Sequence, residues 1–171
     1  WFINEDPFSA IKKRHVNKKD IQSQNIPTLK EVLQFCKQHE LPVNVEIKDL
    51  SKTKFHKSAV AKTIDIIIEE QMQNLVLLSS FNHKYLKEAK KIAPFIQRAA
   101  LQEKSHPPEL SKYLKKLDVV AYNCEDEIVN EEVLSLLKEE NIFVNVFTVN
   151  SKKRKTELFN LGINSIFTDC L

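Results

Sequence analysis

Short runs of apolar residues alternate along the chain with longer stretches in which apolar residues recur every three or four positions. The short runs have the length of β-strands, and the longer stretches have the periodicity of amphipathic helices. The predicted strands are residues 43–48, 75–80, 96–101, 118–123, 142–150 and 163–169. The predicted helices are residues 28–40, 58–71, 83–92, 107–116, 130–140 and 151–161.

Local signals support several of these helix ends. Thr28 and Glu31 have the spacing of a capping box, and Asn130 precedes two glutamates as an N-cap would. Gly162 stands where a helix ends and a left-handed residue is favoured.

The regular alternation of strand and helix predicts a parallel sheet built from successive βα units. The strands are apolar almost throughout, as expected when helices cover one face and a barrel interior the other. We therefore predict an α/β fold of the (β/α)8 TIM-barrel type rather than a doubly wound sheet, with residues 1–171 as one partial domain. Such barrels usually need about 200 residues or more, so the fold is expected to be incomplete, with about six βα units. The open sheet edges predict that the isolated chain aggregates, or that it needs a missing N-terminal segment or a partner to cover those edges. A homo-oligomer would provide such a partner.

The composition narrows the chemistry. With one glycine in 171 residues, neither a dinucleotide-binding loop nor a Walker phosphate loop can be written. A bound phosphate would have to be held by side chains and a metal ion. The net charge of +3 is too small to indicate nucleic acid, and the basic runs at residues 12–14 and 152–155 read as solvated surface.

The chain shows no apolar run long enough to cross a membrane. It also opens without a basic, apolar leader, which predicts a cytoplasmic location. Cys36, Cys124 and Cys170 match neither a zinc motif nor a disulfide framework, so reduced thiols in the core are expected.

Candidate chemistry lies where the predicted strands end, because the active sites of parallel barrels form at that rim. Glu46 and Lys48 point to the same side of their strand, as either a buried ion pair or a metal-binding carboxylate beside a phosphate-binding lysine. Polar and aromatic residues end three further strands at residues 79–81, 147–150 and 167–169. The five histidines are predicted to lie at the surface, in helices or loops; they are His15, His39, His56, His83 and His106.

Five segments, in order and at matching spacing, resemble glycerophosphodiester phosphodiesterases. IPTLKEVL at residues 26–33 is similar to the family's IPTLEEVL, and VNVEIK at residues 43–48 to its xNxEIK strand. Ser80-Phe81 is similar to its SF strand end. VNVFTVN at residues 144–150 resembles VxVWTVN, with Phe147 in place of tryptophan, and LGINSIFTD at residues 161–169 resembles LGVDGIITD.

The resemblance implies a (β/α)8 barrel that hydrolyses glycerophosphodiesters to glycerol 3-phosphate and an alcohol, using a divalent cation, Ca²⁺ or Mg²⁺. It implies a metal ligand at Glu46, a catalytic phosphate contact at Lys48, and a substrate-binding rim made of Ser80, Phe81, Phe147 and Asn150. Such a cation takes carboxylate oxygens and neutralises charge on a phosphoryl group. The partner would be a small-molecule substrate, not nucleic acid.

The N-terminal part of the family pattern is the main departure. The family's HRG and ExD motifs have no counterpart here, and residues 2–8 are similar to its VVxHDxxL segment with Glu5 at the position of the second catalytic histidine. Glu5 is a candidate general base. Three interpretations stay open. The chain is a portion of an active phosphodiesterase, with residues 1–171 alone inactive; it is a catalytically degenerate barrel that acts as a binding or structural domain; or it is an unrelated βα protein whose motifs coincide with those of the family.

Overall fold

The computed structural model describes residues 26–170, and within them six parallel strands form one sheet in chain order. Each strand pairs only with the strands next to it in sequence, so a helix or loop crossover connects every neighbouring pair. The strands are β1 (Val43–Glu46), β2 (Val76–Ser80), β3 (Gln97–Gln102), β4 (Ala121–Glu125), β5 (Phe143–Phe147) and β6 (Ser165–Ile166).

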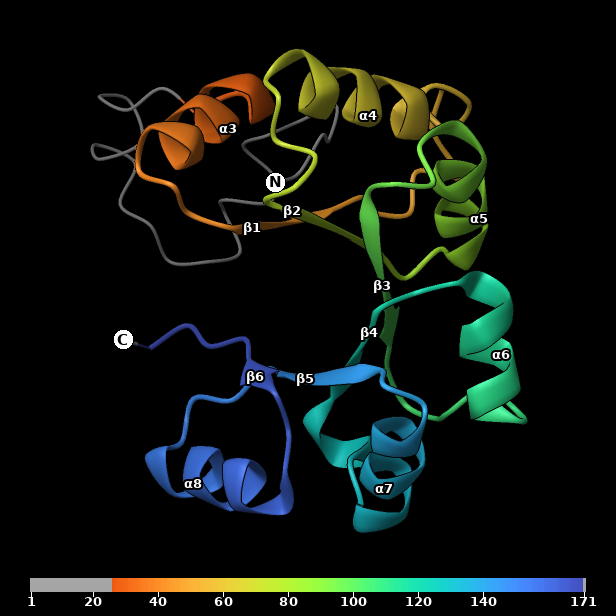
Figure 1. Ribbon diagram of the computed structural model, residues 1–171, viewed down its shortest axis with the longest axis vertical. Helices are drawn as coiled ribbons and strands as arrows, with labels where there is room; N and C mark the ends of the chain where they lie inside the picture. Colours follow the sequence, from red (N-terminus) through yellow and green to blue (C-terminus); the bar gives the residue numbers. More distant parts are fainter. Residues whose placement is uncertain (1–25, 171) are drawn as a thin grey trace.

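The helices lie on the outer side of the curled sheet, and Figure 1 shows them following the sheet around its bend. They are α3 (Leu29–Gln38), α4 (Ala59–Glu69), α5 (His83–Ile92), α6 (Leu110–Leu117), α7 (Glu131–Glu139) and α8 (Lys152–Leu161), with a short 3₁₀ turn η1 (Asp126–Ile128) after β4. The prediction of an incomplete barrel with six βα units is therefore confirmed. Among residues 26–170, no helix is long and apolar enough to cross a bilayer.

The helix ends follow the signals in the sequence. Thr28 accepts a hydrogen bond from the Glu31 backbone N–H, and the Glu31 carboxylate accepts one from the Thr28 N–H at 2.6 Å, which completes the capping box. Asn130 caps α7 by accepting from the Val133 N–H. Gly162 ends α8 with φ of 101°, in the left-handed region that glycine adopts without strain.

The two faces of the sheet have different compositions. We call the side that carries Glu46, Ser79, Asn123 and Asn145 the lumen face, because it lines the hollow inside the bend. We call the opposite side, which packs against the helices, the helix face. Period-two alternation assigns to it the neighbouring residues Val45, Leu78, Cys124 and Val146.

The apolar core lies between the helix face and the helices, in two clusters. One joins β1 and β2 to α3, α4 and α5 through residues such as Leu33, Ile64 and Leu78. The other joins β4 and β5 to α6, α7 and α8 through residues such as Leu114 and Leu137. Cys36 and Cys124 are buried in these clusters as predicted, whereas Cys170 is exposed and departs from that prediction.

The last two strands are shorter than predicted. β5 ends at Phe147 rather than at Asn150, and β6 comprises only Ser165–Ile166. Beyond them one backbone hydrogen bond still joins the two segments, from the Val149 N–H to the Phe167 carbonyl at 2.9 Å. The Asn150 side chain adds to it, since its Oδ1 accepts from the Asp169 N–H at 2.9 Å and from the Thr168 hydroxyl at 3.1 Å.

Candidate active site

Glu46 and Lys48 lie at the carboxyl end of β1 and form an ion pair. The Lys48 Nζ is 2.7 Å from the Glu46 Oε2, with 36 % of the lysine side chain and 21 % of the glutamate side chain exposed. The pair is thus half-buried rather than enclosed, and it keeps a charged lysine within reach of a ligand in the lumen. Both chemical interpretations given from the sequence, an ion pair and a charged ligand site, are compatible with this geometry.

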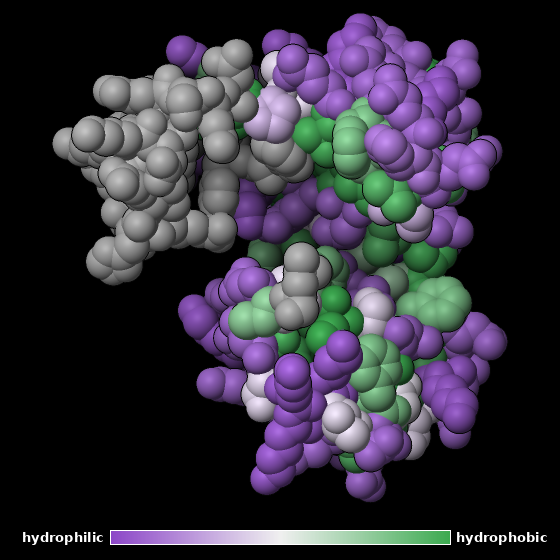
Figure 2. Space-filling view, turned by 90° about the vertical axis from the view of Figure 1, so that its left-hand side faces the viewer, coloured by the Kyte–Doolittle hydropathy of each residue, from purple (hydrophilic) through white to green (hydrophobic). Residues whose placement is uncertain are grey.

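A cavity of about 250 Å³ opens beside this pair, at the carboxyl end of the strands. Its lining joins segments that are far apart in the sequence, because each strand ends at the same rim. The lining residues are Asn44, Glu46, Lys48, Phe81, Leu101, Phe147, Thr148 and Phe167. Figure 2 shows that the molecule is hollowed between the part built on α3 to α5 and the part built on α7 and α8.

Four predicted site residues therefore meet in one cavity: Glu46, Lys48, Phe81 and Phe147. The Phe81 and Phe147 rings are 5.7 Å apart between centroids and nearly perpendicular, at 84°. Phe167 continues the row, 6.4 Å from Phe147 at 76°. An aromatic wall thus faces the charged end of β1.

Two other predicted residues are placed differently. Ser80 lies on the helix face, where its hydroxyl donates to the Ile47 carbonyl at 2.7 Å and accepts from the Asn82 N–H. Asn150 links the ends of β5 and β6 through its contacts with Thr168 and Asp169 and is absent from the lining of the described cavity. Glu5 lies outside the described residues.

Several buried polar atoms on the lumen face find no hydrogen-bond partner within the described part of the chain. They are the Asn44 Oδ1, the Glu46 Oε1, the Ser79 Oγ and the Asn123 Nδ2. Native proteins pair most buried polar groups, so these atoms offer hydrogen-bonding positions to water, to a ligand or to residues outside the described range. The remaining Asn123 and Asn145 groups form a chain in which the Ser165 hydroxyl donates to Asn145 and Asn145 donates to Asn123.

The lumen oxygens allow a direct test of the expected divalent cation. The Asn44 Oδ1 and the Glu46 Oε1 are hard donors of the type that Ca²⁺ and Mg²⁺ take, and both residues line the cavity. Within residues 26–170, however, no three His, Cys, Asp or Glu side chains lie close enough together to hold a metal ion. The described residues therefore do not by themselves form a group that could hold a metal ion.

The histidines overturn the expectation of surface positions in three cases. His39 is exposed, and His15 lies outside the described residues. His56, His83 and His106 are instead half-buried. The Nδ1 atom of each contacts a tyrosine hydroxyl, at 2.8 Å on Tyr85, 2.7 Å on Tyr113 and 2.9 Å on Tyr122, respectively.

Each histidine–tyrosine pair joins one βα unit to the next. The His83 Nε2 donates to the Leu101 carbonyl at 2.9 Å, so the neutral ring accepts the Tyr113 hydroxyl proton at Nδ1. Burial lowers the pKa of His83 below its ordinary value, although the Leu101 carbonyl opposes that effect. None of the histidines in the described residues lines the lumen cavity.

Four lining residues were not predicted as site residues: Asn44, Leu101, Thr148 and Phe167. Asn44 has a recognisable signal, since it precedes Glu46 by two positions and shares its face of the strand. Leu101 has no such signal, because in the sequence an apolar residue at a strand end cannot be distinguished from a residue of the core. Phe167 ends a predicted strand, but only the curl of the sheet brings it to Phe147.

Comparisons with known proteins identify the family that this chain resembles. Residues 3–171 match the family described as "Glycerophosphoryl diester phosphodiesterase family". A glycerophosphodiester phosphodiesterase from Bacillus altitudinis is 33 % identical over 149 residues, covering 84 % of this chain and 59 % of that protein. One from Caldanaerobacter subterraneus is 27 % identical, covering 98 % and 69 %, respectively.

Solved structures give the same picture. An Oleispira antarctica phosphodiesterase, in complex with the product sn-glycerol-3-phosphate, has a TM-score of 0.79 and 26 % identity, covering 88 % of this chain and 60 % of that one. A glycerophosphodiester phosphodiesterase from Thermotoga maritima shares the fold with a TM-score of 0.62 at 19 % identity, covering 88 % and 63 %. The chain spans about three fifths of the length of most of these relatives.

Proposed function

The chain belongs to the glycerophosphoryl diester phosphodiesterase family, and we propose that it contributes the phosphate-binding wall of a site that hydrolyses glycerophosphodiesters to glycerol 3-phosphate and an alcohol. The observation that carries this proposal is the Glu46–Lys48 pair at the open, polar end of β1. A half-exposed ammonium beside a cavity suits a phosphodiester anion, for which the chain offers no glycine-rich loop.

Lys48 is the proposed phosphate contact, and its side chain can move from Glu46 towards a bound phosphoryl oxygen without leaving the cavity wall. Phe81 and Phe147 limit the space beside it. The proposed cation, Ca²⁺ or Mg²⁺, would be held in part by the Glu46 carboxylate and would neutralise charge on the phosphoryl group. Asn44 supplies a second oxygen on the same strand face, and residues outside the described range would have to complete the shell.

A second candidate function is binding without turnover. The specific observation favouring it is that His56, His83 and His106 are each committed to a tyrosine, away from the lumen cavity. The described residues thus place no histidine where it could move a proton to or from substrate. We propose that residues 1–171 alone bind glycerol 3-phosphate but give no phosphodiesterase turnover.

The test combines binding and turnover on the same protein. Calorimetry with sn-glycerol 3-phosphate should show that Lys48→Met weakens binding about 10-fold or more, as expected for loss of a charge-assisted contact. Lys152→Met, the same change on the exposed side of α8, serves as the matched control and should bind like the parent. Equal affinity of Lys48→Met and parent would overturn the phosphate site.

Turnover separates the two candidates. The parent chain is incubated with glycerophosphocholine and Ca²⁺ or Mg²⁺, and glycerol 3-phosphate release is followed by a coupled assay. We expect no release from residues 1–171. Release that disappears in Glu46→Gln would contradict the inactive interpretation and assign hydrolysis to this chain itself.

A further inference from the structure

The lumen cavity is divided by chemistry. On one side β1 contributes three polar side chains, Asn44, Glu46 and Lys48. On the other side β2, β3, β5 and the segment after β6 contribute an almost wholly apolar surface; its residues are Phe81, Leu101, Phe147, Thr148 and Phe167. A ligand that fills the cavity must therefore have two unlike ends, one anionic and one without a need for hydrogen bonds.

The apolar side is a row of three phenylalanine rings. Phe81 meets Phe147 at 84° and Phe147 meets Phe167 at 76°, so each ring stands nearly at right angles to the next. Phe81 keeps 38 % of its surface exposed, and Phe147 and Phe167 are half-buried. The row thus presents ring surface to the cavity instead of closing on itself as core.

The charges around the cavity balance. Of the lining residues that the structure describes, only Glu46 and Lys48 are charged, and they neutralise each other within 2.7 Å. The apolar side of the cavity therefore carries no charged side chain among the described residues, and a volume of about 250 Å³ suits a compact head group rather than an acyl chain.

Resting on the proposed function, we propose that Phe81, Phe147 and Phe167 form the subsite for the alcohol of the substrate, and that this subsite selects a quaternary ammonium head group, that of choline. The negative faces of aromatic rings attract such cations, which ask for no hydrogen bonds in return. A polyhydroxyl head group at the same rings would lose its hydration without finding donors or acceptors. The aromatic wall therefore sets which diester binds, while Lys48 after β1 binds the phosphate group that all of these diesters contain.

The experiment compares three ligands by calorimetry on the parent chain: glycerophosphocholine, its uncharged 3,3-dimethylbutyl isostere, and sn-glycerol 3-phosphate. The isostere has the shape of choline without its charge. We expect glycerophosphocholine to bind about 3- to 10-fold more tightly than the isostere, in the range that a cation over aromatic rings supplies. In Phe147→Leu and Phe167→Leu this ratio should fall towards one.

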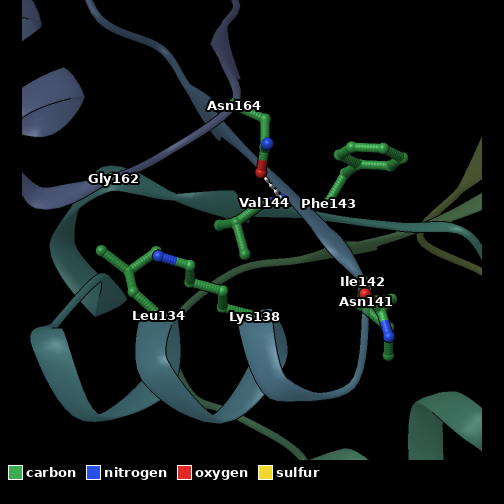
Figure 3. Close-up of a pocket in the computed structure, with 8 residues that line it drawn as sticks. All are labelled: Leu134, Lys138, Asn141, Ile142, Phe143, Val144, Gly162 and Asn164. Atoms are coloured by element: carbon green, nitrogen blue, oxygen red, sulfur yellow. Dashed lines mark hydrogen bonds between the residues drawn. The ribbon is translucent and has the colours of Figure 1, made fainter.

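The matched control is Phe143→Leu, the same substitution at the start of the same strand. Phe143 is 56 % exposed and belongs to the lining of a separate cavity of about 220 Å³. Figure 3 shows its ring pointing away from Leu134 and Lys138, which also line that cavity. It should keep the full ratio. Because partial unfolding lowers the affinity for both diesters equally, the ratio within one variant reports the subsite and not folding.

The outcomes separate this inference from the function it rests on. If sn-glycerol 3-phosphate and the diesters bind and Lys48→Met weakens all three, but the two diesters bind the parent equally, the head-group inference alone is overturned. An unchanged ratio in Phe147→Leu and Phe167→Leu also overturns it. If none of the three ligands binds the parent, the phosphate site fails and the head-group inference fails with it.

Discussion

The helix face and the lumen face belong to the same six strands, yet they differ in how often their buried polar groups are paired. On the helix face Ser80 and the terminal nitrogens of Arg98 make several hydrogen bonds, while the Arg98 Nε has no partner among the described residues. On the lumen face Asn145 bonds to Asn123, but Ser79 and one oxygen of Glu46 are buried without a partner within residues 26–170. Adjacent residues of β2, Ser79 and Ser80, stand on the two sides of this difference.

The difference shows which face holds the molecule together and which is available for a ligand. A satisfied buried group contributes to stability, whereas an unsatisfied one costs free energy that a ligand can recover on binding. We therefore expect substitutions on the helix face to cost stability and substitutions at the unpaired groups of the lumen face to cost little. Four predictions test this division, ordered by the size of the expected effect.

The largest effect is expected in thiol reactivity, because the helix face excludes water. Burial raises the pKa of the Cys124 thiol to about 12, whereas Cys170 is exposed. At pH 8 the thiolate of Cys124 is then scarce, and we expect iodoacetamide to modify Cys170 at least about 1,000-fold faster. Mass spectrometry of the two peptides over time gives the rates, and comparable labelling of both in the folded protein would break the comparison.

The next effect concerns Arg98, whose side chain is 4 % exposed. Its guanidinium donates to the carbonyls of Pro94 at 3.1 Å, Ile96 at 2.6 Å and Asp118 at 2.8 Å. Arg98→Met leaves these acceptors without a donor, and we expect a loss of about 3 kcal/mol in the free energy of unfolding.

The control for Arg98 uses the same partner. Lys90 pairs with the Asp118 carboxylate at 3.3 Å but is 44 % exposed. Lys90→Met should cost about 0.5 kcal/mol or less in urea unfolding, as exposed ion pairs do. Equal costs for the two variants would remove the distinction between a buried clamp and a surface pair.

The two serines of β2 provide the most direct comparison of the faces. Ser80→Ala removes a donor to the Ile47 carbonyl and an acceptor for the Asn82 N–H, and we expect a loss of about 2 kcal/mol. Ser79→Ala removes a buried hydroxyl that has no partner in the described chain, and should be neutral or stabilising by up to about 1 kcal/mol. Urea denaturation measures both, and a destabilising Ser79→Ala would contradict the assignment of its face.

The smallest effect is the pH dependence from His83. Burial lowers its pKa in the folded state below 6.5, so folding favours the neutral ring. The contribution is fully present above pH 6.5 and is lost as the pH falls through the folded pKa, since the unfolded chain takes up the proton first. The free energy of unfolding should therefore fall less steeply between pH 7 and pH 5 in His83→Gln than in the parent.

Much of the fold follows from the sequence because local pattern and sheet geometry agree. The apolar runs predicted all six strands, and Thr28, Asn130 and Gly162 marked helix ends that the structure confirms. The predicted bounds of the last two strands were too long. After Phe147 one backbone hydrogen bond and the contacts of Asn150 with Thr168 and Asp169 join the two segments, and the apolar pattern does not reveal such contacts.

The candidate site was predictable in part for the same reason. Period-two alternation placed Glu46 and Lys48 on one face, and a parallel sheet brings strand ends to one rim. Alternation did not assign Ser80 to the helix face, because the uncharged end of β2 gives no signal for which of its residues face the helices. The histidines were misplaced because their tyrosine partners lie about 16 to 30 residues away in sequence.

The sequence by itself determined the βα order, the incomplete barrel, the family, and the Glu46–Lys48 pair, because each depends on residues close together in the chain or on motifs in register. Only the tertiary structure decided which aromatic rings face that pair, which polar atoms of the described residues lack a hydrogen-bond partner, and which histidines bond to tyrosines of neighbouring βα units. Those features depend on the curl of the sheet. That curl brings Phe81, Phe147 and Phe167 into one row across distances that no sequence pattern spans.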